Sequence, residues 1–282
     1  MTTYFLVSLG STSKIPPTAD RNKNKAVHFY SRKTPEEIKI LRTGGQILAA
    51  ILEKLKDAIA PGVKTKELDS LAEGLITKAG GKPSFKGYKI KGVRPRYPAS
   101  ICISINDEVV HGLPSLRVIR EGDIVGLDIG MEYKELFTDM AETIIVGEGD
   151  AKGRELVEVT RNALGIAISK VHVGGRVGDI GEAVQRYVES KGFGVVRQLV
   201  GHGVGYKVHE EPEIPNWGKA GEGPELRENM VIAIEPMVTE GSPELYLASD
   251  QWTWKTKDAR RAAHFEHTMA VTREGAEVLT GR

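Results

Sequence analysis

The chain has 282 residues, of which 40% are hydrophobic and 27% are charged, and its formal net charge at pH 7 is +1. This length and apolar content suffice for a large buried core, and the near-neutral charge argues against a dedicated nucleic-acid binder, which usually carries a strongly basic surface. Because Cys102 is the one cysteine, an internal disulfide framework and cysteine-based zinc fingers are excluded. A reducing compartment such as the cytoplasm is therefore expected.

Residues 1–32 are predicted to be a polar extension ahead of the folded body. They contain Pro16 and Pro17 and a cluster of basic and amide side chains, and Asp20 is their one acid. The apolar run at residues 4–9 is too short for the core of a signal peptide. No run in the chain approaches the roughly 20 apolar residues of a membrane span, so a membrane location is not expected.

The folded body, residues 33–282, is predicted to open with two helices and then turn to strands. Thr34 to Glu37 has the pattern of a capping box with proline at the first helical position, and the helix should end before Pro61. Thr65 is predicted to cap a second helix that stops at Gly80. The alternation from Ser100 to Ile105 then predicts a strand.

A β-hairpin predicted at residues 127–143 carries two carboxylates. If its turn is centred between Tyr133 and Lys134, Asp128 and Asp139 face each other, with side chains roughly 4.5 to 5.5 Å apart. Apolar neighbours should bury them partly, so they must share a proton or bind a cation. An exposed hairpin with both acids in water is the alternative, and matching ligands in the second half of the chain disfavour it.

The chain is predicted to contain two pseudo-repeats, at about 33–148 and 149–282. A shift of 112 residues aligns Leu68 with Ile180 and Gly80 with Gly192, and the strand patterns continue the match. In the second half this predicts a long helix at about 152–171 and a shorter one at about 179–189. The expected fold class is α+β, with two halves related by a pseudo-twofold axis around one antiparallel sheet and with helices on the outside.

Acids from both halves should then converge near that axis. The candidate metal ligands are Asp128, Asp139, His202, Glu235 and Glu266. Four buried carboxylates and one imidazole need compensation, which two divalent ions roughly 3.5 to 4 Å apart would supply while lowering the pKa of a water between them. Oxygen-rich ligation suits cobalt, manganese or iron(II) at least as well as zinc.

Five motifs occur in a fixed order: H-G-x-P at His111, D-x(10)-D at Asp128, G-H-G-V-G-x-x-x-H-E-E-P at Gly201, I-E-P-M at Ile234 and F-E-H-T at Phe265. Together with the repeats, they resemble type I methionine aminopeptidase, a peptidase family with the pita-bread fold, also called creatinase/aminopeptidase-like. The resemblance covers the chain from Lys33 to its end. It implies a cytoplasmic, monomeric hydrolase that removes the initiator methionine from nascent proteins whose second residue is small.

The resemblance also implies a role for each candidate residue. Asp128 would chelate one metal, Asp139 and Glu266 would bridge both, and His202 and Glu235 would complete the second. The non-ligand histidines, His111 and His209, would contact the substrate and the tetrahedral intermediate, and Glu235 would also move the proton of the attacking water. From the residues alone, His202 has the alternative of a core histidine, Glu266 of a solvated edge acid and His209 of a turn cap. The remaining histidines, which include His264 and His267, are expected to be structural or to lie on the surface.

By motif position, the methionine pocket of the family corresponds to Phe85, Tyr88, Tyr97, Cys102, Val208 and Trp252. An aromatic slot with a polarizable rim suits an unbranched thioether, although each of these residues is equally compatible with an ordinary core. The segment Lys89 to Arg96 is longer than the usual link of the family, and the basic residues in and beside it, with no acid among them, are Lys86, Lys89, Lys91, Arg94 and Arg96. A transient contact with ribosomal RNA is one interpretation of it, and a solvated loop is the one the pattern favours.

Two rivals follow from the same motifs. A proline-directed or broad aminopeptidase of the same fold would typically carry a further N-terminal domain, for which about 33 residues are too few. A catalytically inactive pita-bread binding protein would have lost metal ligands, whereas all five are present here.

Overall fold

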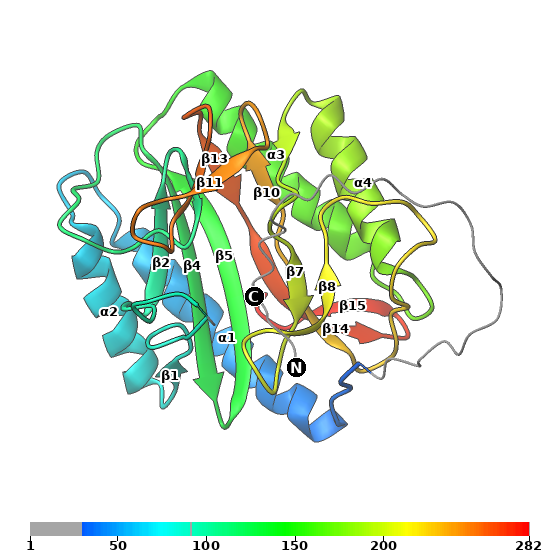
Figure 1. Ribbon diagram of the computed structural model, residues 1–282. Helices are drawn as coiled ribbons and strands as arrows, with labels where there is room; N and C mark the ends of the chain where they lie inside the picture. Colours follow the sequence, from blue (N-terminus) through cyan, green and yellow to red (C-terminus); the bar gives the residue numbers. More distant parts are fainter. Residues whose placement is uncertain (1–29, 91, 282) are drawn as a thin grey trace.

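The computed structural model in Figure 1 describes residues 30–90 and 92–281. The helices are α1 (Pro35–Asp57), α2 (Thr65–Lys78), α3 (Ala151–Ser169) and α4 (Val177–Ser190). The strands are β1 (Lys82–Pro83), β2 (Ile101–Ile105), β3 (Glu108–Val110), β4 (Ile124–Tyr133), β5 (Leu136–Ile145), β6 (Gly194–Val195), β7 (Gly201–Gly203), β8 (Glu210–Ile214), β9 (Val231–Ile234), β10 (Met237–Thr239), β11 (Leu245–Leu247), β12 (Trp254–Thr256), β13 (Ala262–His264), β14 (Glu266–Thr272) and β15 (Gly275–Val278). None of the described helices is both long enough and apolar enough to cross a membrane.

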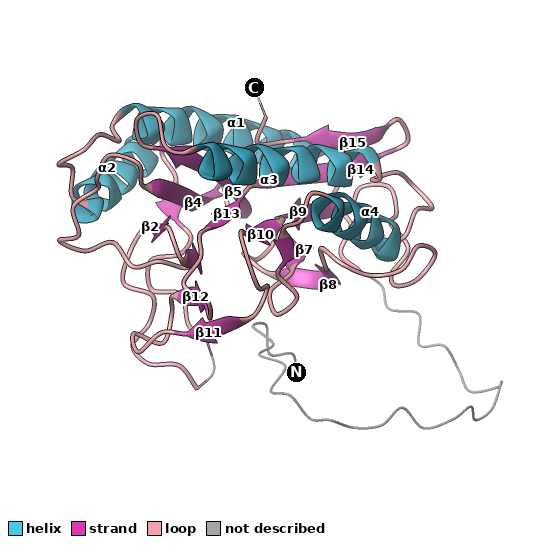
Figure 2. Cartoon of the chain, turned by 90° about the horizontal axis from the view of Figure 1, so that it is seen from above, coloured by secondary structure: helices cyan, strands magenta, loops and turns pink. Residues whose placement is uncertain are grey.

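Nine of the described strands form one antiparallel sheet, in the order β1-β4-β5-β14-β9-β7-β8, with β2 paired to β4 and β15 paired to β14. The helices cover one face of this sheet, and the small sheet of β3, β11 and β12 lies on the other side (Figure 2). One apolar core lies between α1, α2 and the first-half strands, and a second lies between α3, α4 and the second-half strands. The predicted α+β architecture is therefore confirmed.

The helices α2 and α4 occupy corresponding positions in the two halves of the chain. A shift of 112 residues carries α2, Thr65–Lys78, onto α4, Val177–Ser190. The sheets of the two halves join where β5 pairs with β14. Side chains from the first half and from the second half therefore lie next to one another where β5 meets β14.

The starts of α1 and α2 follow different local rules. Glu37 N donates to Thr34 Oγ1 and Thr34 N donates to Glu37 Oε2, so the predicted capping box is confirmed. The prediction that Thr65 caps α2 is wrong, because Lys64 is the N-cap and Thr65 is already helical. The Thr65 hydroxyl instead exchanges hydrogen bonds with the backbone of Ser115.

The predicted hairpin exists, but its register differs from the expected one. The turn is Lys134-Glu135, so Asp128 pairs with Ala141 and Asp139 pairs with Gly130. Both turn residues have positive φ, 49° and 66°, as a two-residue hairpin loop of type I′ requires. The two acids are therefore diagonal neighbours on one face of the sheet rather than directly opposite.

Packing begins before the predicted boundary at Lys33. The extension predicted at residues 1–32 lies outside the described residues up to position 29, but Tyr30 packs against the second-half core. The Lys33 ammonium is fully buried and lies 2.9 Å from Glu210 Oε2 and 2.6 Å from Ser31 Oγ. It also lies 4.2 Å from the centre of the Tyr206 ring. Through these contacts, the segment just before α1 packs against the loop before β8 and against the first residue of β8.

We expect Lys33→Met to lower the free energy of unfolding by roughly 3 to 5 kcal/mol, because it leaves the Glu210 carboxylate buried without its cation. Urea unfolding would measure the loss. Lys39→Met, which removes an exposed lysine of α1, is the matched control and should cost little. In the double variant Lys33→Met/Glu210→Gln the losses should not add, and strict additivity would contradict a direct interaction between the two charges.

Candidate functional site

A row of side chains crosses four neighbouring strands of the large sheet on one face. Cys102 of β2 pairs with Asp128 of β4, Asp128 pairs with Ala141 of β5, and Ala141 pairs with Glu266 of β14. Asp139 lies two positions before Ala141, on the same face of β5. The small Ala141 side chain stands between two carboxylates, which leaves space between them.

Glu235 joins this row from the end of β9, beside a short break in strand pairing. β9 pairs with β14 up to Ile234 and His267, and β10 pairs with β13 from Met237 and His264. Between these pairs, the amide of Phe265 donates to the carbonyl of Pro236. The register is the same on both sides of the break, so Glu235 lies opposite Glu266, which the pairing of β14 with β5 already places on this face.

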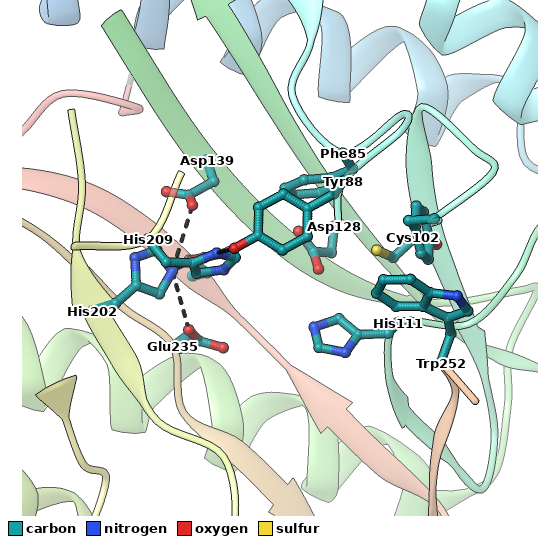
Figure 3. Close-up of a pocket in the computed structure, with 12 residues that line it drawn as sticks. Phe85, Tyr88, Cys102, His111, Asp128, Asp139, His202, His209, Glu235 and Trp252 are labelled. Atoms are coloured by element: carbon teal, nitrogen blue, oxygen red, sulfur yellow. Dashed lines mark hydrogen bonds and ion pairs between the residues drawn. The ribbon is translucent and has the colours of Figure 1, made fainter. Parts of the chain in front are cut away.

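His202 faces three of the acids (Figure 3). Its Nε2 lies 3.6 Å from Asp139 Oδ2, 3.6 Å from Glu235 Oε1 and 4.0 Å from Glu266 Oε1. Its Nδ1 lies 3.0 Å from the Gly203 carbonyl oxygen, which accepts only, so Nδ1 carries a proton and Nε2 has its lone pair free for a metal. Asp139, His202 and Glu266 form a group that fits one ion. The core-histidine alternative is inconsistent with this arrangement.

The two glycines that flank His202 permit this close packing. A Cβ on Gly201 would lie 2.5 Å from the Ala233 carbonyl oxygen, and one on Gly203 would lie 2.4 Å from the Glu211 carbonyl oxygen. The neighbouring strands β9 and β8 therefore approach the backbone on both sides of the histidine. This explains the G-H-G pattern by backbone contact.

Asp139 and Glu266 are buried, Asp128 and Glu235 are half-buried, and no lysine or arginine of the described residues forms an ion pair with any of them. The pKa values of the four acids are raised as a result. Burial raises the pKa of Asp128 to about 7 and that of Glu235 to about 8. Burial and the neighbouring carboxylates also raise the pKa of Glu266 well above its usual range, and burial raises that of Asp139. Glu266 is 3% exposed, so the solvated-edge alternative for it is wrong. In their ionised forms these carboxylates repel one another, and divalent cations would neutralise them. The cluster therefore supports a metal centre.

The non-ligand histidines border the same cavity. His209 Nδ1 lies 2.8 Å from the Tyr88 hydroxyl, and the His209 ring packs edge-on against His202. His111 lies at a bend with φ of 57°, next to Gly112, where a Cβ would lie 2.2 Å from the Ile103 carbonyl oxygen. Burial lowers the pKa of His111 to about 3 and that of His209 well below its usual range, so both imidazoles are neutral.

The other end of the cavity is apolar. Figure 3 shows Cys102 and Trp252 on the side away from His202, with Phe85 and Tyr88 above. Tyr97 packs edge-on against Trp252, and the Trp252 indole N–H donates to the Pro95 carbonyl at 3.1 Å. The long basic loop thus supports the pocket wall, and Tyr97 keeps its predicted place.

Of the predicted pocket residues, one differs. Val208 is buried, but the cavity is lined by Phe85, Tyr88, Tyr97, Cys102, His111, Asp128, Asp139, His202, His209, Glu235, Trp252 and Glu266. The next residue, His209, takes the position that faces the cavity. Val208 is therefore not among the residues that line this cavity, and its place in the methionine pocket stays a prediction.

Sequence reasoning missed three residues that support the ligands. The Thr268 hydroxyl donates to Asp139 Oδ1 at 2.8 Å, and the Asn216 amide donates to the Glu235 carbonyl at 2.9 Å. His264 is 4% exposed, and its Nε2 lies 3.5 Å from Glu235 Oε2. Thr268 lies two residues after Glu266, as an inward-facing strand position must, so its spacing was the one available signal.

The chain is similar to known metallopeptidases in both sequence and structure. Residues 39–273 match the family model described as Metallopeptidase family M24. Methionine aminopeptidase 1 of Bacillus subtilis is 46% identical over 88% of this chain and 98% of its own length. The crystal structure of a methionine aminopeptidase from Thermotoga maritima superposes with a TM-score of 0.86 at 45% identity, covering 90% of this chain and all of that one. A prolidase from Pyrococcus furiosus is 25% identical with a TM-score of 0.70, and the match covers 65% of its length.

We expect the metal-free protein to lose stability as the pH rises. Asp128 and Glu235 bind protons more tightly in the folded state than in the unfolded chain, where carboxyl pKa values are near 4. Their contribution is fully present below about pH 4 and is lost as the pH rises through about 7 to 8. Melting temperatures of chelator-treated protein between pH 5 and 8.5 would measure this.

Manganese should raise the melting temperature most at the alkaline end, because the ions displace those protons. Glu235→Gln should flatten the pH slope, and Glu155→Gln, on the exposed face of α3, is the control. A metal-free protein whose stability rises steadily from pH 5 to 8.5 would contradict the raised pKa values.

Proposed function

Because the chain belongs to metallopeptidase family M24, we propose that it removes the N-terminal methionine from newly made proteins whose second residue is small. The observation that carries this proposal is one cavity with two unlike ends. Four buried acids and a histidine gather at one end, and Cys102 and Trp252 with neighbouring aromatic rings form an apolar slot at the other. A peptide whose first side chain fills the slot would have its first peptide bond near the acids.

The proposed metal ligands are Asp128, Asp139, His202, Glu235 and Glu266. Their geometry fits, since the donors are oxygen-rich, buried and uncompensated, and His202 directs a free lone pair at them. When bound, two divalent ions supply an activated water and polarise the scissile carbonyl. Cobalt, manganese, iron(II) and zinc all suit this donor set. Thr268 holds Asp139 by a hydrogen bond, so this ligand is oriented in advance.

We assign proton and charge handling to Tyr88, His209 and Glu235, and a substrate contact to His111. Burial raises the pKa of Tyr88 to about 12, so its phenol stays protonated and would donate to His209 Nδ1, which lies 2.8 Å away. That leaves the His209 proton on Nε2, from which it would stabilise negative charge that develops on the scissile carbonyl oxygen. His111, which borders the same cavity, would contact the substrate backbone. Glu235 would accept the proton of the attacking water and pass it to the departing amine.

Specificity would come from shape. Phe85, Tyr88, Tyr97, Cys102 and Trp252 form the proposed methionine slot. An unbranched thioether can follow such a slot, whereas a β-branched side chain cannot. The second residue would lie near His111, where a bulky side chain would meet the wall.

The finer assignments belong to the same proposal. We place the protein in the cytoplasm as a monomer with no membrane and no specific nucleic-acid partner, acting on nascent chains. Transient ribosome contact would use Lys89, Arg94 and Arg96 of the loop whose Pro95 carbonyl accepts from Trp252. Lys91, predicted to belong to this basic set, lies outside the described residues.

The first test is substrate choice. With one manganese-loaded preparation, Met-Ala-Ser and norleucine-Ala-Ser should both be cut, at rates that differ by no more than about 10- to 200-fold, because one altered atom in such a slot is worth only about 1 to 3 kcal/mol. Met-Leu-Ser should be cut slowly because of its second residue, and Leu-Ala-Ser because of its first. Fast cleavage of Ala-Pro-Ser with poor cleavage of Met-Ala-Ser would make the protein a proline-directed aminopeptidase instead.

The second test separates ligands from non-ligands. Asp139→Asn should lose both metal content and activity, because a neutral amide cannot bridge two cations. His209→Ala should keep its metal while kcat falls by about 10² to 10⁴. The metal content and the kinetics of each purified variant, measured together, show whether the substituted residue is a metal ligand. Full turnover by Asp139→Asn, or loss of metal from His209→Ala, would overturn the respective assignment.

A further inference from the structure

His264 is a buried histidine that the proposed roles leave unused. It ends β13, two residues before Glu266, and it is 4% exposed. Its Nε2 is fully shielded from solvent and has no hydrogen-bond partner among the described residues. An unpaired ring nitrogen in a buried position is costly, so a partner is expected when the site is in its working arrangement.

The Glu235 carboxylate is the group that faces this nitrogen. Glu235 Oε2 lies 3.5 Å from His264 Nε2, and Glu235 Oε1 lies 3.6 Å from His202 Nε2. The carboxylate therefore stands between two imidazoles. If the oxygen beside His202 serves the metal, the oxygen beside His264 is the one left for a second partner.

The backbone on both sides of this contact is fixed. The His264 amide donates to Thr143 Oγ1 at 2.9 Å, and Thr143 Oγ1 donates to the His264 carbonyl at 2.7 Å. His264 also pairs with Met237, two residues after Glu235. A shift of a few tenths of an ångström by the Glu235 side chain would close the 3.5 Å gap to hydrogen-bond length.

We infer that His264 holds Glu235 in place by donating a hydrogen bond from Nε2 to Oε2, which makes it a positioning residue for the metal centre. Carboxylates that bind metal are themselves hydrogen-bonded, and loss of such a partner typically costs 10- to 100-fold in metal affinity or activity. The bond needs only a proton on Nε2, which both the neutral tautomer and the cation can supply. Of the two expectations for His264, a surface location is wrong, and its structural role is specific to Glu235.

The inference rests on the proposed function, and a cobalt(II) titration tests it apart from catalysis. Calorimetry on chelator-treated protein would compare the wild type with His264→Leu and His264→Gln. We expect His264→Leu to bind one cobalt ion about 10- to 100-fold more weakly and to cut Met-Ala-Ser with lowered kcat and little change in KM. His264→Gln keeps an N–H donor of similar reach and should retain most of both.

His267→Leu is the matched control, since His267 is also largely buried but bonds Thr280 Oγ1 on the other side of β14. It should change stability without changing cobalt affinity. Unchanged cobalt affinity in folded His264→Leu, or equal losses in the Leu and Gln variants, would overturn the inference. If the wild type binds cobalt but cuts only X-Pro peptides, the methionine specificity fails, while weaker cobalt binding by His264→Leu still supports the role of His264.

Discussion

Four carboxylates buried around one imidazole are the constraint on which the rest of the structure depends. Each of the five groups comes from a different segment of the same sheet: Asp128 from β4, Asp139 from β5, His202 from β7, Glu235 from the end of β9 and Glu266 from the start of β14. They are shielded from bulk solvent, so their mutual repulsion is strong. A sheet held by two apolar cores can keep such groups together, and these cores lie between the sheet and the helices on its outer face.

The two ends of the cavity are built on different kinds of support. The ligands stand on paired strands, where side-chain positions are set to a fraction of an ångström by the register. Phe85, Tyr88 and Trp252 stand instead on loops, and the link between Trp252 and Pro95 ties one loop to another. The positions of the metal-ligand candidates therefore depend on the shared sheet. The shape of the apolar slot depends instead on loops, and loops tolerate long segments such as the one after Tyr88.

Much of this arrangement could be predicted from the sequence, and the failures have local causes. The capping box at Thr34 and the correspondence of α2 and α4 follow from local sequence patterns. Of the five ligand candidates, Asp139, His202 and Glu266 form a group that could hold one ion. The hairpin register was missed because Lys134 and Glu135 occupy positive-φ turn positions without the glycine or asparagine that usually marks them. The ion pair of Lys33 with Glu210 was not predicted, because a contact between residues so far apart in the sequence leaves no periodic signal.

The interruption between β9 and β10 places a metal-ligand candidate and its neighbour on either side of one short break in the sheet. Pro236 has no amide proton to donate to a ladder, and regular pairing of β9 stops after Ile234. Because the break occurs at matching positions, with Phe265 opposite Pro236, pairing resumes in the same register in β10 and β13. The resumed pairing brings His264 back beside Glu235. Glu235 and the side chain that we infer to hold it are thus placed together by the shared register of two neighbouring strands.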